Sequence, residues 1–190
     1  MLYDITLRVT PKMVTDAQTN LKKAMVGHLG THFDVMNKEF PLDYIKRPCV
    51  VFNVKGISGR DIEVSDVDLL KVHKGMFVAF YSGFIEEEGY GSKRYFAEHP
   101  QLSKELIDNL LNKKISMIGV DFSGVRNGKE HNPTDQYCAD RGVFIVENMC
   151  NLAPLCGKEN ITTYTFPINF EGYTGLPCRV VVEIPDTNTV

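Results

Sequence analysis

Residues 103–121 read SKELIDNLLNKKISMIGVD, a candidate helix followed directly by a candidate strand. The serine at position 103 is a residue type that caps helix N-termini. The leucines at 106, 110 and 111 recur on one stripe, as in a helix with one buried face. The run from Ile115 to Asp121 is nearly continuously apolar, which is typical of a strand covered on both faces. We therefore expect a crossover unit of an α/β protein.

A second helix–strand pair of the same kind follows. Residues 134–142 (TDQYCADRG) predict a helix, with Thr134 as its N-cap and Gly142 as its stop. The strand after it is Val143–Val146, and a weaker helical pattern covers Thr15–Met25. The remaining predicted strands are Tyr3–Val9, Cys49–Val54, Met76–Tyr81, Thr162–Phe170 and Arg179–Ile184. The expected fold class is α/β, a single compact domain over 1–190 with a mixed sheet, in which residues 185–190 form a loosely ordered tail.

Composition places the chain among ordinary globular proteins. Of its 190 residues 43% are hydrophobic and 24% are charged, values that exclude a disordered or low-complexity chain. The net charge of -3 gives no basis for binding nucleic acid or an anionic membrane. The longest uncharged apolar stretch, from Gly75 to Ile85, is far shorter than the ~18 residues of a membrane span. Five scattered cysteines without a CxxC pair indicate free thiols, so we expect a cytoplasmic protein.

The clearest chemical pattern lies at residues 27–34, GHLGTHFD. His28, His32 and Asp34 supply two imidazoles and a carboxylate, a ligand set that zinc and manganese accept. In a straight strand the two histidines would be about 13 Å apart, too far to share an ion. A bend at Gly30 followed by an extended segment would bring them together and place His32 and Asp34 on one side. The alternative is a pair of hydrogen-bonded histidines near a surface carboxylate.

Two further acidic residues end predicted strands. Asp121 follows the run ISMIGV, and Glu147 follows VFIV. In open α/β sheets, ligands gather beyond the carboxyl ends of the strands, which makes both residues candidates for a site. Each can equally be a strand-end hydrogen-bond acceptor or a helix cap.

On these residues the chain resembles the putative cyclase family of metal-dependent hydrolases, which contains bacterial kynurenine formamidase and isatin hydrolase. The family signature H-x-G-T-H-x-D-x-P-x-H is matched at its first seven positions, from His28 to Asp34. Segments similar to those of the family continue in order along the chain: LYDIT (2–6), GMFVAFYSGF (75–84), IGVDFSGV (118–125), GVFIVENMCNL (142–152) and FEGYTGLPCRVV (170–181).

The resemblance implies a swivelling β/β/α-type fold, assembled as a homodimer or homotetramer. It implies one or two divalent ions, zinc or manganese, held by His28, His32 and Asp34, with Glu147 contributing from the Val-Glu-Asn segment. It also implies hydrolysis of a small-molecule amide, an aryl formamide or a cyclic amide, which is arylformamidase-like chemistry. An ion of this kind lowers the pKa of its bound water and polarises the carbonyl that is attacked.

One metal ligand of the family is changed here. The family has a histidine twelve residues before the glutamate, and Asp135 stands at that position. Asp135 would still bind an ion, and its oxygen makes manganese or magnesium more favourable than in the zinc enzymes. It could instead be an ordinary acid in the first turn of a helix. His131, four residues earlier, could bend in as a substitute, although a loop histidine beside Glu130 and Lys129 is typically solvated.

The proton-transfer histidine of the family is changed as well. Lys38 stands at its position, and Met36 replaces the preceding proline. An exposed lysine stays protonated at neutral pH, so Lys38 would be a base only if it were desolvated near a metal. It could instead donate a hydrogen bond to an oxyanion or bind a substrate carboxylate. The alternative is that Lys38 has no role in the site and forms an ordinary surface pair with Glu39.

The leading hypothesis is therefore a cytoplasmic metal-dependent amidohydrolase in which Lys38 replaces the usual acid/base as a polariser or substrate anchor. The changed positions motivate an alternative, a non-catalytic descendant that binds a metal or a metabolite on the same fold. A lyase or cyclase reaction on the same metal is not separated from hydrolysis by the sequence.

Overall fold

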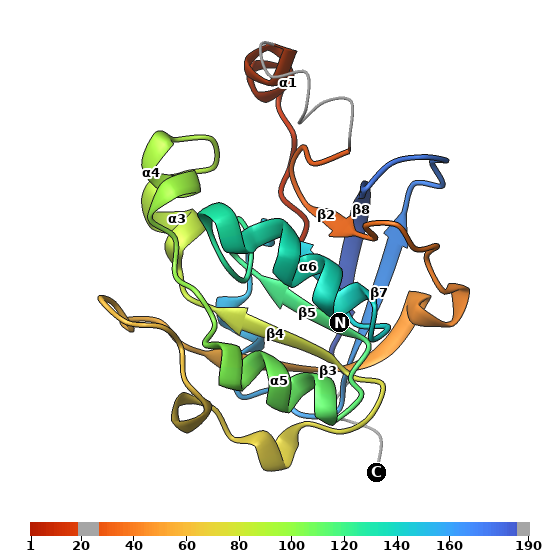
Figure 1. The fold of residues 1–190 in the computed structure, drawn as a ribbon. Helices are drawn as coiled ribbons and strands as arrows, with labels where there is room; N and C mark the ends of the chain where they lie inside the picture. The colour runs from red at the N-terminus through yellow and green to blue at the C-terminus, as the bar shows by residue number, and fades with distance from the viewer. Residues whose placement is uncertain (19–26, 186–190) are drawn as a thin grey trace.

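A computed structural model describes residues 1–18 and 27–185, which fold around a curved mixed sheet (Figure 1). The strands are β1 (Leu2–Asp4), β2 (His32–Asp34), β3 (Lys46–Asn53), β4 (Phe77–Tyr81), β5 (Met117–Val120), β6 (Phe144–Glu147), β7 (Ile161–Pro167) and β8 (Gly175–Glu183). Their order is β1-β8-β2-β6-β5-β4-β3-β7, and β7 pairs again with β8. The sheet therefore closes into a barrel, with β1 outside the ring on β8.

The direction of the strands divides the barrel into two parts. Strands β3, β4, β5 and β6 are parallel neighbours. Strands β2, β7 and β8 join them with antiparallel pairing, β2 next to β6 and β7 next to β3. The parallel part requires crossover connections, whereas the antiparallel part is closed by shorter turns and loops.

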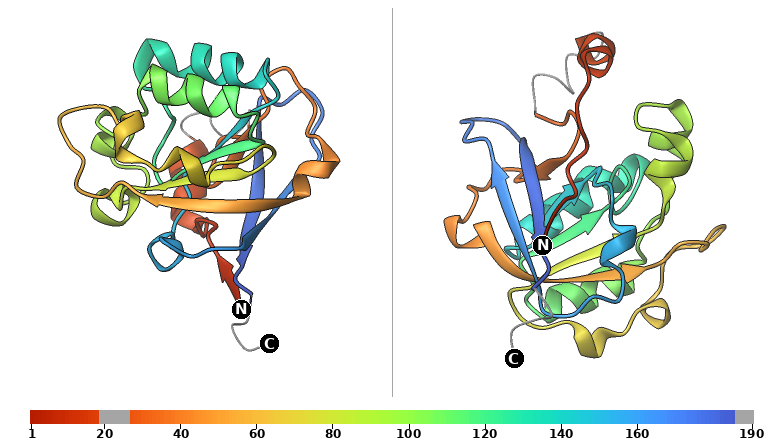
Figure 2. Two further views of the ribbon diagram at one scale, coloured as in Figure 1. Left: turned by 90° about the horizontal axis from the view of Figure 1, so that it is seen from below. Right: turned by 180° about the vertical axis from the view of Figure 1, so that it is seen from behind.

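Two helices cover the parallel part. The α-helices among the described residues are α1 (Pro11–Gln18), α3 (Phe84–Glu88), α4 (Lys93–Ala97), α5 (Lys104–Asn112) and α6 (His131–Ala139). Helices α5 and α6 lie side by side on one face of the sheet (Figure 2). Helix α5 connects β4 with β5, and α6 connects β5 with β6. None of the helices among the described residues has both the length and the apolar character needed to cross a membrane.

Alternate side chains of the parallel strands enter two cores. The helix-side core takes Val50, Phe52, Val78, Phe80, Ile118, Val120 and Ile145 from the sheet. Leu106 and Leu110 of α5 are completely buried in this core, and each such burial stabilises the fold by about 1.5–3 kcal/mol. The core inside the barrel contains Phe33, Val51, Phe77, Ala79, Met117, Phe144, Val146, Val180 and Val182. The sheet therefore has no solvent-facing side over these strands, which explains their continuous apolar runs.

The predicted α/β class is confirmed: the structure is a single compact α/β unit with a mixed sheet. Both predicted helix–strand pairs form crossovers between parallel strands. Ser103 caps α5, because its Oγ accepts a hydrogen bond from the backbone N–H of Leu106 at 3.1 Å. The expected tail at 185–190 lies outside the described residues except for Pro185.

Some predicted boundaries are wrong. Helix α6 begins at His131, so Thr134 is inside the helix and is not its N-cap. Pro133 fits there because the first backbone N–H groups of a helix have no partner within it. Strand β1 ends at Asp4, well before the predicted end at Val9. The helix predicted at 15–25 begins earlier, at Pro11, and its part beyond residue 18 lies outside the described residues.

Candidate metal centre

Strand β2 presents two potential ligands on one side. It is only three residues long, and its hydrogen bonds to β6 and β8 keep it extended. Phe33 points into the barrel core and is fully buried, so its neighbours His32 and Asp34 both point to the opposite, helix-covered side. Gly30 precedes the strand with φ +70°, a left-handed conformation that glycine adopts without strain. The predicted bend at Gly30 is confirmed.

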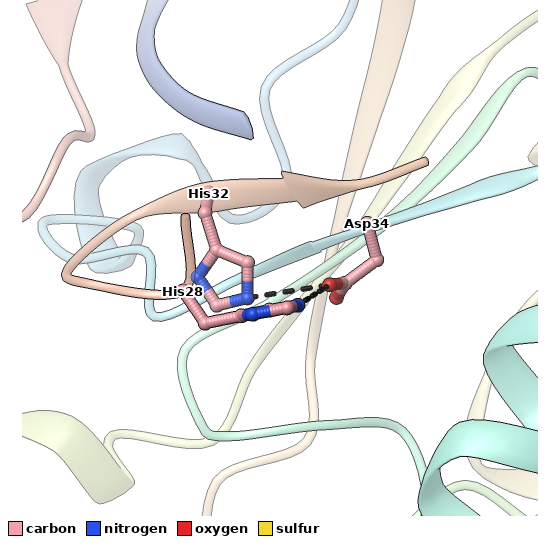
Figure 3. A group of neighbouring side chains, drawn as sticks. All are labelled: His28, His32 and Asp34. Atoms are coloured by element: carbon pink, nitrogen blue, oxygen red, sulfur yellow. Dashed lines mark ion pairs between the residues drawn. The ribbon is translucent and has the colours of Figure 1, made fainter. Parts of the chain in front are cut away.

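This bend brings His28 back onto the strand. Figure 3 shows the His28 and His32 rings converging on the Asp34 carboxylate. His28 Nε2 lies 3.0 Å from Asp34 Oδ1, and His32 Nε2 lies 3.4 Å from the same oxygen. Gly175 of β8 makes room for His28, because a Cβ at this position would lie 2.7 Å from its ring. The three side chains form one group with donor atoms close enough to share an ion.

A second group of potential metal ligands lies at the start of α6 and includes Glu147 at the end of β6. His131 and Asp135 are one helical turn apart, and His131 Nε2 lies 3.3 Å from Asp135 Oδ2. His131 Nε2 also lies 3.5 Å from Glu147 Oε1 at the end of β6. The other ring nitrogen of His131 donates to the carbonyl of Arg126 at 3.1 Å, which leaves Nε2 as the basic nitrogen. These three residues form a second group with convergent donor atoms.

Glu147 joins the two groups. In the β2–β6 register it stands directly opposite His32. Its Oε2 lies 3.5 Å from His32 Nε2, while its Oε1 faces His131. A carboxylate with one oxygen directed at each group has the geometry of a bridge between two neighbouring sites.

The two aspartates are buried without enough partners. Asp34 Oδ2 and Asp135 Oδ1 have no hydrogen-bond partner in the part of the chain that the structure describes, although both side chains are about 2% exposed. Within residues 1–18 and 27–185, the ion pairs of these two aspartates are formed with histidines. A buried carboxylate with so little compensation is costly, and a divalent cation would remove that cost. Three imidazoles and three carboxylates are also a donor set that zinc and manganese accept, so the residues fit such an ion.

The pKa directions agree with a site prepared for cations. Burial acts to raise the pKa of Asp34, but the charge of His32 and hydrogen bonds from His28 and His32 outweigh it and hold the pKa below its ordinary value. Burial, together with the negative charge of Asp34, raises the pKa of Asp135 well above its ordinary value. Burial lowers the pKa of His131 and so favours the neutral imidazole that a metal requires. The charge of Asp34 acts on the pKa of both Asp135 and His131, so the two groups are electrostatic neighbours.

Two other candidates from the sequence lie elsewhere. Asp121 is a buried strand-end acceptor: it receives hydrogen bonds from Ser82 N and Oγ and from Gly83 N, at 2.6–3.0 Å. Lys38 lies beyond β2 with its ammonium 2.7 Å from Asp140 Oδ1, at the C-terminal end of α6. Lys38 thus forms a surface ion pair, as in the alternative without a function, but its partner is Asp140 and not Glu39.

The structure thus brings together His28, His32, Asp34, Asp135 and Glu147, as the sequence suggested. It adds His131, which the sequence left as a solvated loop residue or a substitute ligand. The signal for His131 was its spacing of four residues from Asp135, which aligns both on one face of a helix. That signal was hidden because the predicted helix began three residues too late.

The chain belongs to the cyclase family: the family model described as "Putative cyclase" matches residues 3–125, more than half of the chain. No curated protein sequence matches the chain. The matched region contains the segment from His28 to Asp34 and strands β2 to β5, whereas His131, Asp135 and Glu147 follow it in the chain.

Solved structures share the fold over nearly the whole chain. "The Structure Of Potential Metal-Dependent Hydrolase With Cyclase Activity" is 21% identical, with a TM-score of 0.76 over 98% of both chains. A predicted metal-dependent hydrolase from Bacillus stearothermophilus is 21% identical, with a TM-score of 0.70 over 96% of this chain and 97% of the other. An isatin hydrolase bound to the product analogue thioisatinate is 18% identical, with a TM-score of 0.69 over 83% and 72%. The expected cyclase-type fold is thereby confirmed.

Proposed function

We propose that the protein is a metal-dependent hydrolase that cleaves the amide bond of a small molecule. The observation that carries this proposal is the joining of two histidine–carboxylate groups by Glu147. One ion would be held by His28, His32 and Asp34. A second would be held by His131, Asp135 and Glu147. A divalent ion bound here supplies a Lewis acid for the amide carbonyl and acidifies a water molecule.

The exposure of the ligands indicates the side from which substrate approaches. The side chains of His32, Asp34, Asp135 and Glu147 are at most 3% exposed. Those of His28 and His131 are 24% and 26% exposed. We therefore propose that the centre opens to substrate between these two histidines, with the buried carboxylates as its water-poor floor. A substrate carbonyl held at this opening faces the imidazoles, and the low-dielectric floor strengthens every charge interaction there.

The substrate class proposed is an aryl formamide or a cyclic amide. The structural likeness to isatin hydrolase supports it, since isatin is a cyclic amide. Lys38 is proposed to bind a carboxylate of the substrate or product. Its present partner, Asp140, is half exposed, and ion pairs of this kind contribute about 0–1 kcal/mol, so the ammonium can exchange partners at low cost.

The first test is elemental analysis of the purified, dialysed protein, followed by an amide substrate screen with zinc and with manganese. We expect one or two ions per chain and turnover of a formanilide or an isatin-type lactam. His32→Asn and Asp34→Asn should each reduce both the metal content and the turnover. A metal content that is unchanged in both variants would place the ion elsewhere and refute the site.

A second candidate is a non-catalytic protein that binds a metabolite at the same centre. The observation that favours it is Lys38, which stands at the proton-transfer position of the family and is engaged by Asp140. A small amide or carboxylate would then raise the melting temperature of the metal-loaded protein without forming product. Turnover above the rate with free metal ion alone would eliminate this candidate.

A further inference from the structure

Asn148 directly follows Glu147, and hydrogen bonds engage both its backbone and its side chain. Its side chain is buried, and its backbone has φ +56°, a conformation that asparagine tolerates better than most residues. Its backbone N–H donates to the carbonyl of Phe122 at 3.1 Å, and its own carbonyl accepts from Thr31 Oγ1 at 2.7 Å. The backbone of Asn148 is therefore held on both sides of its Cα, which fixes the point from which its side chain extends.

The Asn148 amide acts on the bend before β2. Its Nδ2 donates to the carbonyl of Gly30 at 3.0 Å, and its Oδ1 accepts from the hydroxyl of Tyr95 at 2.8 Å. The opposite amide orientation would set Oδ1 against the Gly30 carbonyl, placing two acceptors together. The hydroxyl of Tyr95 thus helps to keep the donor of Asn148 directed at Gly30.

The same carbonyl is the partner of His32. His32 Nδ1 lies 3.0 Å from Gly30 O, and a carbonyl can only accept, so Nδ1 carries a proton. The Asn148 amide nitrogen lies 3.4 Å from this Nδ1; since both are donors, it packs against the ring and leaves Gly30 O as the acceptor. With Nδ1 engaged in this way, the ring directs Nε2 toward Asp34 and Glu147.

The remaining polar group of Gly30 is held by the segment that contains α3 and α4. The backbone N–H of Gly30 donates to the hydroxyl of Tyr90 at 3.1 Å. The rings of Tyr90 and Tyr95 contact each other, with centroids 5.6 Å apart. Residues 84–97 thus reach the bend through two tyrosine hydroxyls, one acting directly and one through Asn148.

We infer that Asn148, supported by Tyr95, is a positioning residue that keeps the proton of His32 on Nδ1 and thereby offers Nε2 to an ion. Partners of this kind hold metal-binding imidazoles in one orientation, and their loss typically weakens metal affinity by 10–100-fold. The consequence for affinity rests on the proposed metal centre. The consequence for the proton on His32 Nδ1 does not.

The experiment compares the parent protein with Asn148→Gly and Tyr95→Phe. Glycine is chosen because it accepts the positive φ of position 148. Tyr44→Phe is the matched control, since it removes a partly buried hydroxyl that donates to Gly142 O at 2.7 Å, outside this network. Two quantities are measured: water exchange of the His32 Nδ1 proton by NMR on metal-free, histidine-labelled protein, and the zinc dissociation constant. The signal of His32 is assigned by its absence in His32→Gln.

In the parent and in Tyr44→Phe we expect a slowly exchanging Nδ1 proton on His32. In Asn148→Gly that protection should be lost and the zinc dissociation constant should rise 10–100-fold; Tyr95→Phe should shift both in the same direction by less. Folded variants with the protected proton and the zinc affinity of the parent would overturn the inference. If the parent itself binds no zinc, the proposed metal centre fails, while the proton measurement still decides the role of Asn148.

Discussion

Asp121 and Glu147 occupy equivalent places and have different surroundings. Each is buried, and each stands at the carboxyl end of one of two neighbouring parallel strands, β5 and β6. Asp121 meets backbone and hydroxyl donors where β4 ends, at Ser82 and Gly83. Glu147 instead meets imidazoles, since its strand borders β2 and is covered by the start of α6. Both carboxylates stand at strand ends, and their neighbours decide their roles: Asp121 supports the chain, whereas Glu147 joins a candidate metal centre.

The largest expected effect is that of Glu147→Gln. Glutamine cannot replace the negative charge between the two groups, so we expect the variant to lose at least one bound ion. In the parent, zinc at about 100 times its dissociation constant should stabilise the fold by about 2.7 kcal/mol, and a chelator should remove that gain. Thermal unfolding with and without chelator measures this. A variant that binds as many ions per chain as the parent, and gains as much stability from them, would show that Glu147 is not a ligand.

Gly175→Ala tests the contrast between the surroundings of Glu147 and those of Asp121 by adding a methyl group beside His28. The added Cβ would lie 2.7 Å from the His28 ring, so the ring must leave its place against Asp34. We expect zinc affinity to fall by about 10–100-fold, the range seen when a ligand loses its orientation. The matched control is Gly83→Ala, beside Asp121, where the new Cβ meets the flexible end of Lys55 and the residue has φ +77°.

The control should lower stability by about 1 kcal/mol without changing zinc affinity, because its φ is unfavourable for alanine. Isothermal titration with zinc and chemical unfolding of both variants give the two numbers. Equal zinc affinities in the two variants would show that the close approach of Gly175 to His28 has no role in the centre.

The sequence predicted one half of the candidate centre better than the other. The spacing of His28, His32 and Asp34 around Gly30 is local, so chain geometry alone could predict that they converge. The place of His131 depends on where α6 begins and on its contact with the Arg126 carbonyl, which are set by tertiary packing. The two crossover units could be predicted because each consists of a helix and the strand that directly follows it in the chain. The closure of the barrel through β7 and β8 could not be predicted, since pairing between strands from distant segments leaves no local signal in the sequence.

Asp121→Asn should affect stability and leave the metal alone. The carboxylate accepts from three donors, and the amide of asparagine would turn one donor group against the backbone N–H groups of Ser82 and Gly83. An unsatisfied buried donor costs about 1–3 kcal/mol, so we expect a loss of about 2 kcal/mol in the free energy of unfolding. Denaturant titration of the metal-free protein measures it. If a folded Asp121→Asn variant lost zinc binding, Asp121 would belong to the metal centre, and its proposed difference from Glu147 would be wrong.

Lys38→Gln is expected to have the smallest effect on the fold and a selective one on substrate binding. Its ion pair with Asp140 is between half-exposed groups, so its loss should change stability by less than about 1 kcal/mol. If the ammonium anchors a substrate carboxylate, KM should rise with little change in kcat, because only ground-state binding is lost. Asp140→Asn is the matched variant: it breaks the same ion pair but keeps the ammonium, so its KM should stay at or below that of the parent. A drop in kcat in Lys38→Gln without a rise in KM would instead assign Lys38 to proton transfer, and equal KM values in both variants would leave the ion pair as its only role.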